Sequence, residues 1–266
     1  MIRTAGFALL LTSVAGPLAA QAKEASLWQF GNLQQGYCIH FLVSPADAGS
    51  VLPDEAQPVR LDAMADAPPA LIRVMQDQPE YGAWMPAAVC VFRFGRADGA
   101  GRELVAAAGA SEMIGMVGYW ARVSAAQPPS SPYVPMMFTN DKRIAKATDS
   151  SKVAFRLLKT SFGAAAHGDD ERHVISFGKT SLIWDGHAAS DSAPLAAPLE
   201  KVWALQSPRS PILIRWKLTA STSRSMVGAL VVEGKDKLAK VLRNSPIRYL
   251  GPIYQGGLAE LTLVPE

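Results

Sequence analysis

The sequence predicts an α+β domain dominated by an antiparallel sheet or barrel, with a few short helices. About ten segments have the length and the apolar, β-branched content of strands, whereas only three or four carry helix signals. No repeat of fixed period and no clear linker divides the chain. Hydrophobic residues make up 49% of the sequence and charged residues 18%, which is enough apolar material for a sizeable core.

Residues 1–22 have the pattern of a signal peptide. Arg3 is the charged start, residues 5–16 are the apolar stretch, and Ala-Gln-Ala at 20–22 fits the cleavage pattern. The apolar run is too short for a stable membrane span, and the alternative is a buried N-terminal helix. We therefore expect export to the periplasm or the extracellular space, with residues 23–266 forming a single α+β barrel domain.

One strand followed by one short helix is predicted at the start of the chain after residue 22. After a polar lead-in over residues 23–36, Tyr37–Val43 is a predicted strand. Ser44 is a good N-cap and Pro45 suits the first turn, so a short helix follows and ends by Pro53. A loop rich in proline and alanine comes next.

The middle of the chain is predicted to consist mainly of strands. Ala70–Met75 and Ala87–Phe94 are predicted strands joined by a turn-rich stretch, and residues 113–123 are a further candidate. Thr139 or Asn140 can cap a short helix. Other predicted strands are Val153–Thr160, His173–Phe177, Thr180–Trp184, Lys201–Leu205 and Ile212–Leu218.

The C-terminal block combines a strand, a helix and a long bent strand. Residues 226–234 are apolar and β-branched, which is typical of a buried strand. Residues 235–246 place apolar side chains on one helical face and lysines on the other. Residues 247–264 alternate apolar and polar positions and break at Gly256-Gly257.

Composition and motifs exclude several function classes. The net charge is +3, or +2 without Arg3, which is too weak to indicate a nucleic-acid partner. No later stretch is long enough to cross a bilayer. The sequence contains no HxxxH, HxH, P-loop, GxGxxG or GxSxG pattern, so neither a metal site nor a cofactor is expected. His40 lies in an apolar strand and is interpreted as a core residue.

The two cysteines, Cys38 and Cys90, each lie inside an apolar predicted strand. Their spacing fits neither a zinc site nor a redox motif. Export permits a disulfide between them. Nothing in the sequence places them opposite one another, so we expect two buried, unpaired thiols.

Lysines are candidate nucleophiles because a desolvated lysine, or one beside another cation, can be a neutral amine. Lys152 leads into a predicted strand and Lys159 lies seven residues further on, so the two point to opposite faces. Arg156 shares the face of Lys152. The alternative is that all three are solvated cations on the strand.

Five segments, taken in order, resemble the acetoacetate decarboxylase family. They are Tyr37–Asp47 with the Leu-Pro turn at 52–53, Met75–Phe94, Pro135–Phe138, Ile144-Ala145 and Leu238–Val264. The resemblance implies a cone-like, closed β-barrel with a central cavity and an oligomeric assembly. It also implies decarboxylation or related reactions of β-keto acids through a lysine Schiff base.

The residues that carry this chemistry in the family are not matched here. Without gaps, Ala-Thr-Asp at 147–149 replaces the family's Gly-Arg-Glu, and Ala-Phe-Arg at 154–156 replaces its Pro-Lys-Lys. Pro86 and Leu71 fall where the family has glutamates, and Gln35 falls where it has an arginine. An arginine cannot act as a neutral amine nucleophile.

We therefore predict an exported, acetoacetate-decarboxylase-like protein that binds a small apolar or oxo-acid molecule in a central cavity without decarboxylating it. Arg156 is expected to hold a carboxylate of the ligand. Phe155, Leu71, Pro86 and Trp84 are the other predicted binding residues.

Two alternatives stay open. One is a Schiff-base lyase that acts on a β-keto acid through Lys152 or Lys159. The other is an exported structural or partner-binding barrel. A homo-oligomer is compatible with the predicted function and with both alternatives. A lysine pointing into an enclosed cavity favours the enzyme, a cavity without lysine favours ligand binding, and a filled barrel favours the structural protein.

Overall fold

The computed structural model describes residues 26–65, 67–99, 102–105, 112–123, 127, 131–149, 155–158, 160–167, 170–205 and 212–264. The α-helices are α1 (Pro45–Val51), α2 (Pro69–Asp77), α3 (Lys142–Asp149) and α4 (Lys237–Asn244), and the 3-10 helices are η1 (Leu61–Ala63) and η2 (Pro79–Ala83). The strands of the first half are β1 (Ser26–Val43), β2 (Gln57–Pro58), β3 (Met85–Gly99), β4 (Arg102–Val105), β5 (Glu112–Tyr119), β6 (Ala121–Arg122) and β7 (Tyr133–Thr139). Those that follow are β8 (Phe155–Leu157), β9 (Thr160–His167), β10 (Asp170–Phe177), β11 (Thr180–Ala188), β12 (Ala193–Pro194), β13 (Leu199–Leu205), β14 (Ile212–Thr219), β15 (Thr222–Arg224), β16 (Met226–Glu233), β17 (Arg248–Leu250), β18 (Ile253–Gln255) and β19 (Leu258–Val264).

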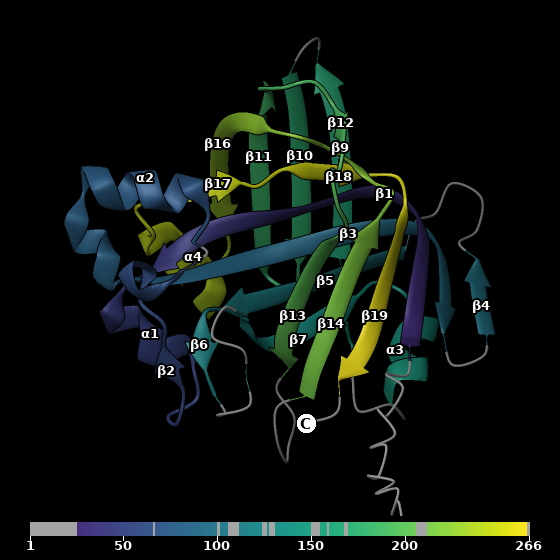
Figure 1. Cartoon of the computed structure of the whole chain (residues 1–266), viewed down its shortest axis with the longest axis horizontal. Coiled ribbons are helices and arrows are strands. Elements are labelled where there is room, and N and C mark those ends of the chain that lie inside the picture. Colours follow the sequence, from purple (N-terminus) through teal and green to yellow (C-terminus); the bar gives the residue numbers. More distant parts are fainter. Residues whose placement is uncertain are drawn as a thin grey trace, which may run out of the picture.

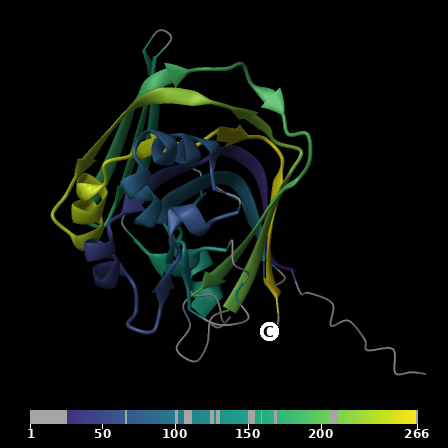
Figure 2. The ribbon, with the colours of Figure 1, turned by 60° about the vertical axis from the view of Figure 1, so that its left-hand side comes forward.

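The largest sheet returns to its starting strand. Pairings lead from β1 through β19, β14, β13, β7, β5 and β3 and back to β1. The predicted α+β, cone-like architecture is confirmed, although the β13–β7 and β7–β8 pairings are parallel rather than antiparallel. Figure 1 shows β1 and β3 side by side across the molecule, with β14 and β19 crossing below them, and Figure 2 shows how strongly β1 and β3 curve.

A second, four-stranded sheet in the order β16-β11-β10-β9 covers one outer side of β1 and β3. Because side chains alternate along a strand, odd-numbered β1 residues such as Ile39 and Phe41 pack with Phe177 and Trp184 of this sheet. Even-numbered residues such as Cys38 face the interior of the ring. The alternation therefore separates an outer core from an inner one.

The inner core is rich in aromatic side chains. The rings of Phe30 and Phe94 stack with centroids 4.9 Å apart, and those of Trp203 and Trp216 stack at 5.6 Å. Phe92 lies 5.0 Å from Trp216. Large, rigid rings of this kind bury much apolar area, so they fix this part of the interior firmly.

Local signals correctly predict the helices α1 and α4. Ser44 Oγ accepts a hydrogen bond from Asp47 N–H at the start of α1. At α4, Asp236 Oδ1 accepts from Ala239 N–H, and Val241 and Leu242 are buried. The capping serine predicts α1 and the apolar face predicts α4, and both are local signals.

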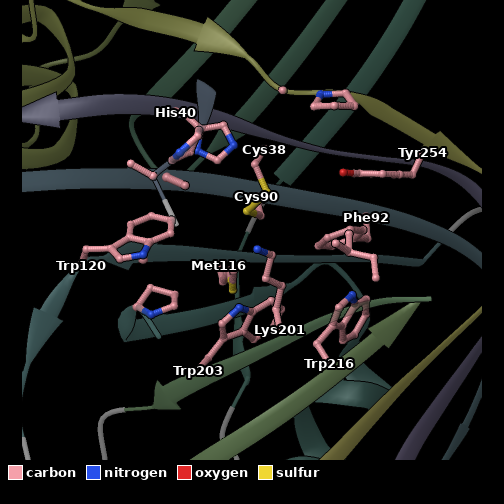
Figure 3. A pocket seen from close by; sticks show the side chains of 18 of the residues that line it. Cys38, His40, Cys90, Phe92, Met116, Trp120, Lys201, Trp203, Trp216 and Tyr254 are labelled. Carbon is pink, nitrogen blue, oxygen red and sulfur yellow. A yellow bond between two sulfur atoms is a disulfide. The ribbon is translucent and has the colours of Figure 1, made fainter. Parts of the chain in front are cut away.

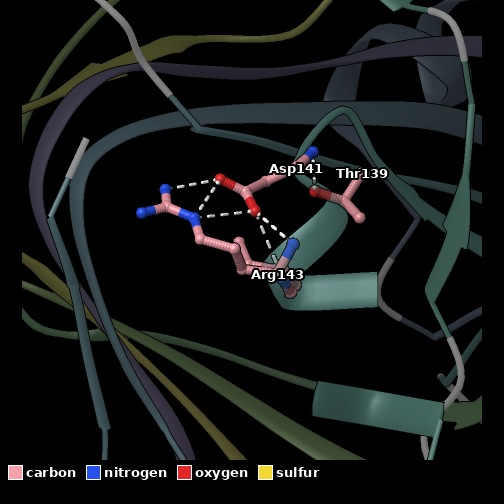
Figure 4. A network of polar contacts seen from close by, with 4 residues as sticks. Thr139, Asp141 and Arg143 are labelled. Carbon is pink, nitrogen blue, oxygen red and sulfur yellow. Dashed lines mark hydrogen bonds and ion pairs between the residues drawn. The ribbon is translucent and has the colours of Figure 1, made fainter. Parts of the chain in front are cut away.

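The start of α3 is fixed by Asp141 (Figure 4). Its carboxylate accepts hydrogen bonds from the backbone N–H groups of Arg143 and Ile144 and from the Arg143 guanidinium, while Thr139 Oγ1 accepts from Asp141 N–H. Burial raises the pKa of Asp141, but these hydrogen bonds outweigh it and leave the pKa below its usual range. The helix is in the predicted place, but Asp141 accepts the bonds from its first turn, whereas Thr139 or Asn140 was expected to cap it.

Three sequence-based expectations about the elements are wrong. Residues 70–75 form part of helix α2 rather than a strand, because Pro68 and Pro69 suit a first helical turn and only Leu71 is buried. The expected lead-in over 23–36 belongs largely to β1, since Trp28 and other alternating apolar residues face the core. The expected strand over 153–160 is instead divided between β8 and β9, which pair in different sheets.

Residues 1–22 lie outside the described residues, so the signal peptide stays a prediction. Within the described part of the chain, no helix has the length and apolar character needed to cross a membrane.

Candidate ligand-binding site

Cys38 and Cys90 form a disulfide, which corrects the expected pair of free thiols. The β1–β3 register places the two residues directly opposite each other, with their Cα atoms 4.0 Å apart. Both side chains lie on the inner face of the ring. Each cysteine could be assigned to a strand from the sequence, but the register between strands 52 residues apart could not.

The disulfide forms part of the wall of a cavity of about 340 Å³ inside the ring. Most of the wall is apolar or aromatic, and Figure 3 shows Met116, Trp120, Trp203 and Trp216 around it. The described lining residues are Cys38, His40, Ala67, Pro68, Pro69, Ala88, Cys90, Phe92, Met116, Gly118, Trp120, Pro132, Leu199, Lys201, Trp203, Trp216, Gly251, Pro252 and Tyr254.

Lys201 is the one cationic side chain among these described lining residues, which include no Asp or Glu. It lies on β13 two residues before Trp203, so strand alternation directs both side chains to the cavity. In Figure 3 the Lys201 amine points toward the Cys38–Cys90 disulfide. The residue is exposed to solvent, which places it where the cavity opens.

His40 lies on the same strand face as Cys38. Its ring stacks on Tyr249 with centroids 5.1 Å apart and lies 6.5 Å from the ring of Trp120. Burial, and secondarily the charge of Lys201, lower the pKa of His40 to about 4. The imidazole is therefore neutral at pH 7. The prediction of a simple core histidine is incomplete, because part of the ring borders the cavity.

The wall also contains a hydrogen-bond donor without an acceptor. Trp216 Nε1 is buried and has no hydrogen-bond partner among the described residues. Tyr254 lies on the same wall, and burial raises the pKa of its hydroxyl, so the group stays protonated. The site thus combines one cation and a neutral imidazole in apolar surroundings, and the Trp216 N–H in its wall is not itself accessible from the cavity.

No family model matches the chain, and no curated protein matches it. Solved structures do. Acetoacetate decarboxylase from Legionella pneumophila matches with a TM-score of 0.49 and 14% identity, covering 90% of this chain and 85% of that one. The enduracididine biosynthesis enzyme MppR, solved with pyruvate, matches with a TM-score of 0.47 and 11% identity, covering 93% and 92%.

An acetoacetate decarboxylase-like enzyme from Sphingomonas wittichii matches with a TM-score of 0.47 and 10% identity, covering 91% of this chain and 94% of that one. The chain resembles acetoacetate decarboxylases. At these identities the likeness concerns the acetoacetate-decarboxylase-like fold alone.

The predicted site residues are dispersed in the structure. Phe155 is buried in the inner core, whereas Arg156 is exposed on β8. Leu71 and Trp84 belong to a small separate cluster around Leu42 and Leu61.

Pro86 is buried at the start of β3. Lys152 and Lys159 lie outside the described residues. The cavity lining does not include Pro86, Phe155, Arg156, Leu71 or Trp84. Their part in binding therefore stays a prediction.

Sequence reasoning missed the residues that line the cavity. The sequence does contain a usable signal in two strands. Cys38 and His40 are two residues apart in one strand, so they share a face, and the same holds for Lys201 and Trp203 in another. The signal does not say which face is internal. That choice depends on pairings between distant strands.

A second polar cluster lies between β1 and the four-stranded sheet. His173 is buried, with Nδ1 3.4 Å from Gln35 Nε2 and Nε2 3.0 Å from Glu171 Oε2. Arg224 pairs with both carboxylate oxygens of Glu171. Burial lowers the pKa of His173 although Glu171 opposes the shift. We assign this cluster a structural role, because its members bind one another.

Proposed function

We propose that this protein binds a small carboxylate, an oxo acid or a similar molecule with an apolar body, in the cavity beside Lys201 without decarboxylating it. One observation carries the proposal: a single described cation borders a largely apolar cavity. An ammonium group binds a carboxylate by a charge-assisted hydrogen bond, and the apolar wall accommodates the rest of the molecule.

The charges around Lys201 support an anionic ligand. His40 is neutral, and no carboxylate occurs among the described lining residues. The charge of Lys201 is therefore available to a ligand. The cavity volume of about 340 Å³ suits a small molecule. Trp216 Nε1, which has no acceptor among the described residues, is a candidate donor to a second oxygen after a small shift of the ring.

The absence of decarboxylation is part of the proposal. A lysine Schiff base requires a neutral amine, which desolvation or an adjacent cation produces. Lys201 is exposed to solvent, and no second cation accompanies it among the described lining residues. The family's lysine pair is also replaced by Phe155 and Arg156 at ungapped register.

Export is proposed as well, to the periplasm or the extracellular space. It is supported by the pattern of residues 1–22 and is compatible with the disulfide. Secreted material that begins at or near Lys23 would agree with it, whereas an intact Met1 on the mature protein would contradict it.

Isothermal titration of acetoacetate and its methyl ester tests the binding proposal, because the two differ in charge at the carboxyl group. A panel of short oxo acids and fatty acids extends the comparison. The wild type is expected to bind acids and not esters. Lys201→Met should weaken acid binding roughly tenfold or more, the range for a lost hydrogen bond to a charged group. Lys201→Arg should retain much of it.

The matched control is Lys217→Met, because Lys217 lies outside the cavity lining and pairs with Glu200 at 3.4 Å. Its binding should equal that of the wild type. Equal affinity for acid and ester, no binding of any acid at millimolar concentration, or an unchanged affinity in Lys201→Met would each contradict the proposal.

The second candidate is a Schiff-base lyase, and the presence of a lysine in the cavity wall is the observation that favours it. Borohydride trapping with small β-keto acids distinguishes the two functions. A stable adduct mapped to Lys201, Lys152 or Lys159, and lost when that lysine is replaced by Arg, would establish the lyase. Absence of any adduct together with measurable binding supports the binding protein.

A further inference from the structure

The Cys38–Cys90 disulfide lies on the wall of the ligand cavity rather than inside a sealed core. Cys38 is half-buried, whereas Cys90 is only 2% exposed. A molecule in the cavity can therefore reach Cys38 more easily than Cys90. Lys201, whose amine points toward the disulfide in Figure 3, lies where the cavity opens to solvent.

We propose that this disulfide is a reactive site, at which a small thiol entering the cavity undergoes thiol–disulfide exchange. The thiolate RS⁻ attacks Cys38 Sγ, the S–S bond breaks, and Cys90 Sγ leaves as a thiolate. A second thiolate then attacks the mixed disulfide at the sulfur of the bound RS group. The products are RSSR and two protein thiols, so two electrons pass from the small thiols to the protein and the two thiol protons end on the cysteines.

Lys201 favours both steps. A cation near the disulfide attracts the incoming thiolate and stabilises the thiolate that leaves. The incoming thiol reacts as the thiolate that forms in solution, so the neutral His40 beside Cys38 takes no proton from it. The lysine and the disulfide therefore line the same cavity.

Reduction need not disturb the strands. The residues on either side of the cysteines are themselves paired, Tyr37 with Val91 and Ile39 with Val89, within a β1–β3 ladder that runs from Trp28 to Val43. The two thiols would thus stay opposite each other after reduction. This makes the exchange reversible by a small disulfide.

The inference does not depend on the carboxylate ligand. It predicts that the size of the reductant matters, because access is through a cavity of about 340 Å³. The experiment compares 2-mercaptoethanol with a thioredoxin-type protein dithiol on the folded, full chain. Reduced cysteines are alkylated with iodoacetamide and counted by intact mass, while circular dichroism confirms that the fold persists.

The expected result is reduction of the native protein by 2-mercaptoethanol and little reaction with the protein dithiol. Lys201→Met should slow the small-thiol reaction roughly fivefold at low salt, since one unit charge near the sulfur is removed. Lys201→Arg and the control Lys217→Met should react at about the wild-type rate.

Reduction that proceeds only at the rate of global unfolding, or equally fast with both reductants, would overturn the proposal. An unchanged rate in Lys201→Met would refute the role of the lysine. Failure of carboxylate binding would leave these outcomes untouched, because the thiol reaction is measured without any carboxylate.

Discussion

Acid should destabilise the folded protein through His40. The groups that face its imidazole are Lys201 on β13, Tyr249 on β17 and the Trp120 ring. None of them is an anion that would stabilise a protonated imidazole. Burial first, and the charge of Lys201 second, hold the pKa of His40 near 4.

The size of the effect follows from proton linkage. In the unfolded chain the pKa of a histidine is about 6.5. Below pH 6.5 the histidine of the unfolded chain binds a proton that the folded protein excludes. The contribution of neutral His40 to the free energy of unfolding is therefore fully present above pH 6.5 and is lost as the pH falls toward 4. At 1.36 kcal/mol per pKa unit, the loss from His40 reaches about 3 kcal/mol at pH 4.

Urea unfolding at pH 7 and at pH 4 measures this loss, and the variant His40→Gln isolates it from the carboxylates and His173, which also titrate. The wild type should lose about 3 kcal/mol more than the variant over this interval. NMR titration of Lys201→Met should show a raised His40 pKa that still lies below the ordinary value, because burial is the larger cause. The same pH dependence in wild type and His40→Gln would refute the reasoning.

Three further outcomes concern stability. Gly115→Ala should cost about 1–3 kcal/mol, because an added Cβ would lie 2.1 Å from the Phe138 ring, and Phe138→Leu should recover part of the loss. Ser245→Ala should cost about 1–3 kcal/mol, since the serine Oγ accepts the buried Leu42 N–H at 2.9 Å; Ser245→Thr is the conservative control. The oxidised protein should be about 4 kcal/mol more stable than the reduced one, because the cross-link closes a loop between residues 52 apart. Denaturant titrations check all three, and differences within error of zero would contradict them.

Elements with local signals could be predicted from the sequence, and their positions agree with the structure. Ser44 and Pro45 determine the start of α1, and the apolar face of α4 is visible in the residues after Asp236. The strand β14 follows from its alternation of apolar and polar residues, and β13 follows from the apolar run that ends it. These signals act over a few residues, so no tertiary information is needed to interpret them.

The apolar run at Ala70–Met75 shows where local patterns are ambiguous. Six residues of this composition suit a short strand or a helix equally well. The structure forms a helix that begins at Pro69 and buries Leu71 against Leu61 and Leu42. Pro68 and Pro69 at the first turn favour the helix, and the contacts of Leu71 with other elements complete the choice.

The sequence alone determined that Cys38, His40, Lys201 and Trp203 lie in strands. It also determined that Cys38 shares a strand face with His40, and Lys201 with Trp203. Only the tertiary structure decided that these faces meet in one cavity and that Cys38 lies opposite Cys90. The physical reason is that strand register and ring closure depend on hydrogen bonds and packing between residues far apart in the chain. A shift of one residue would turn the same side chains outward.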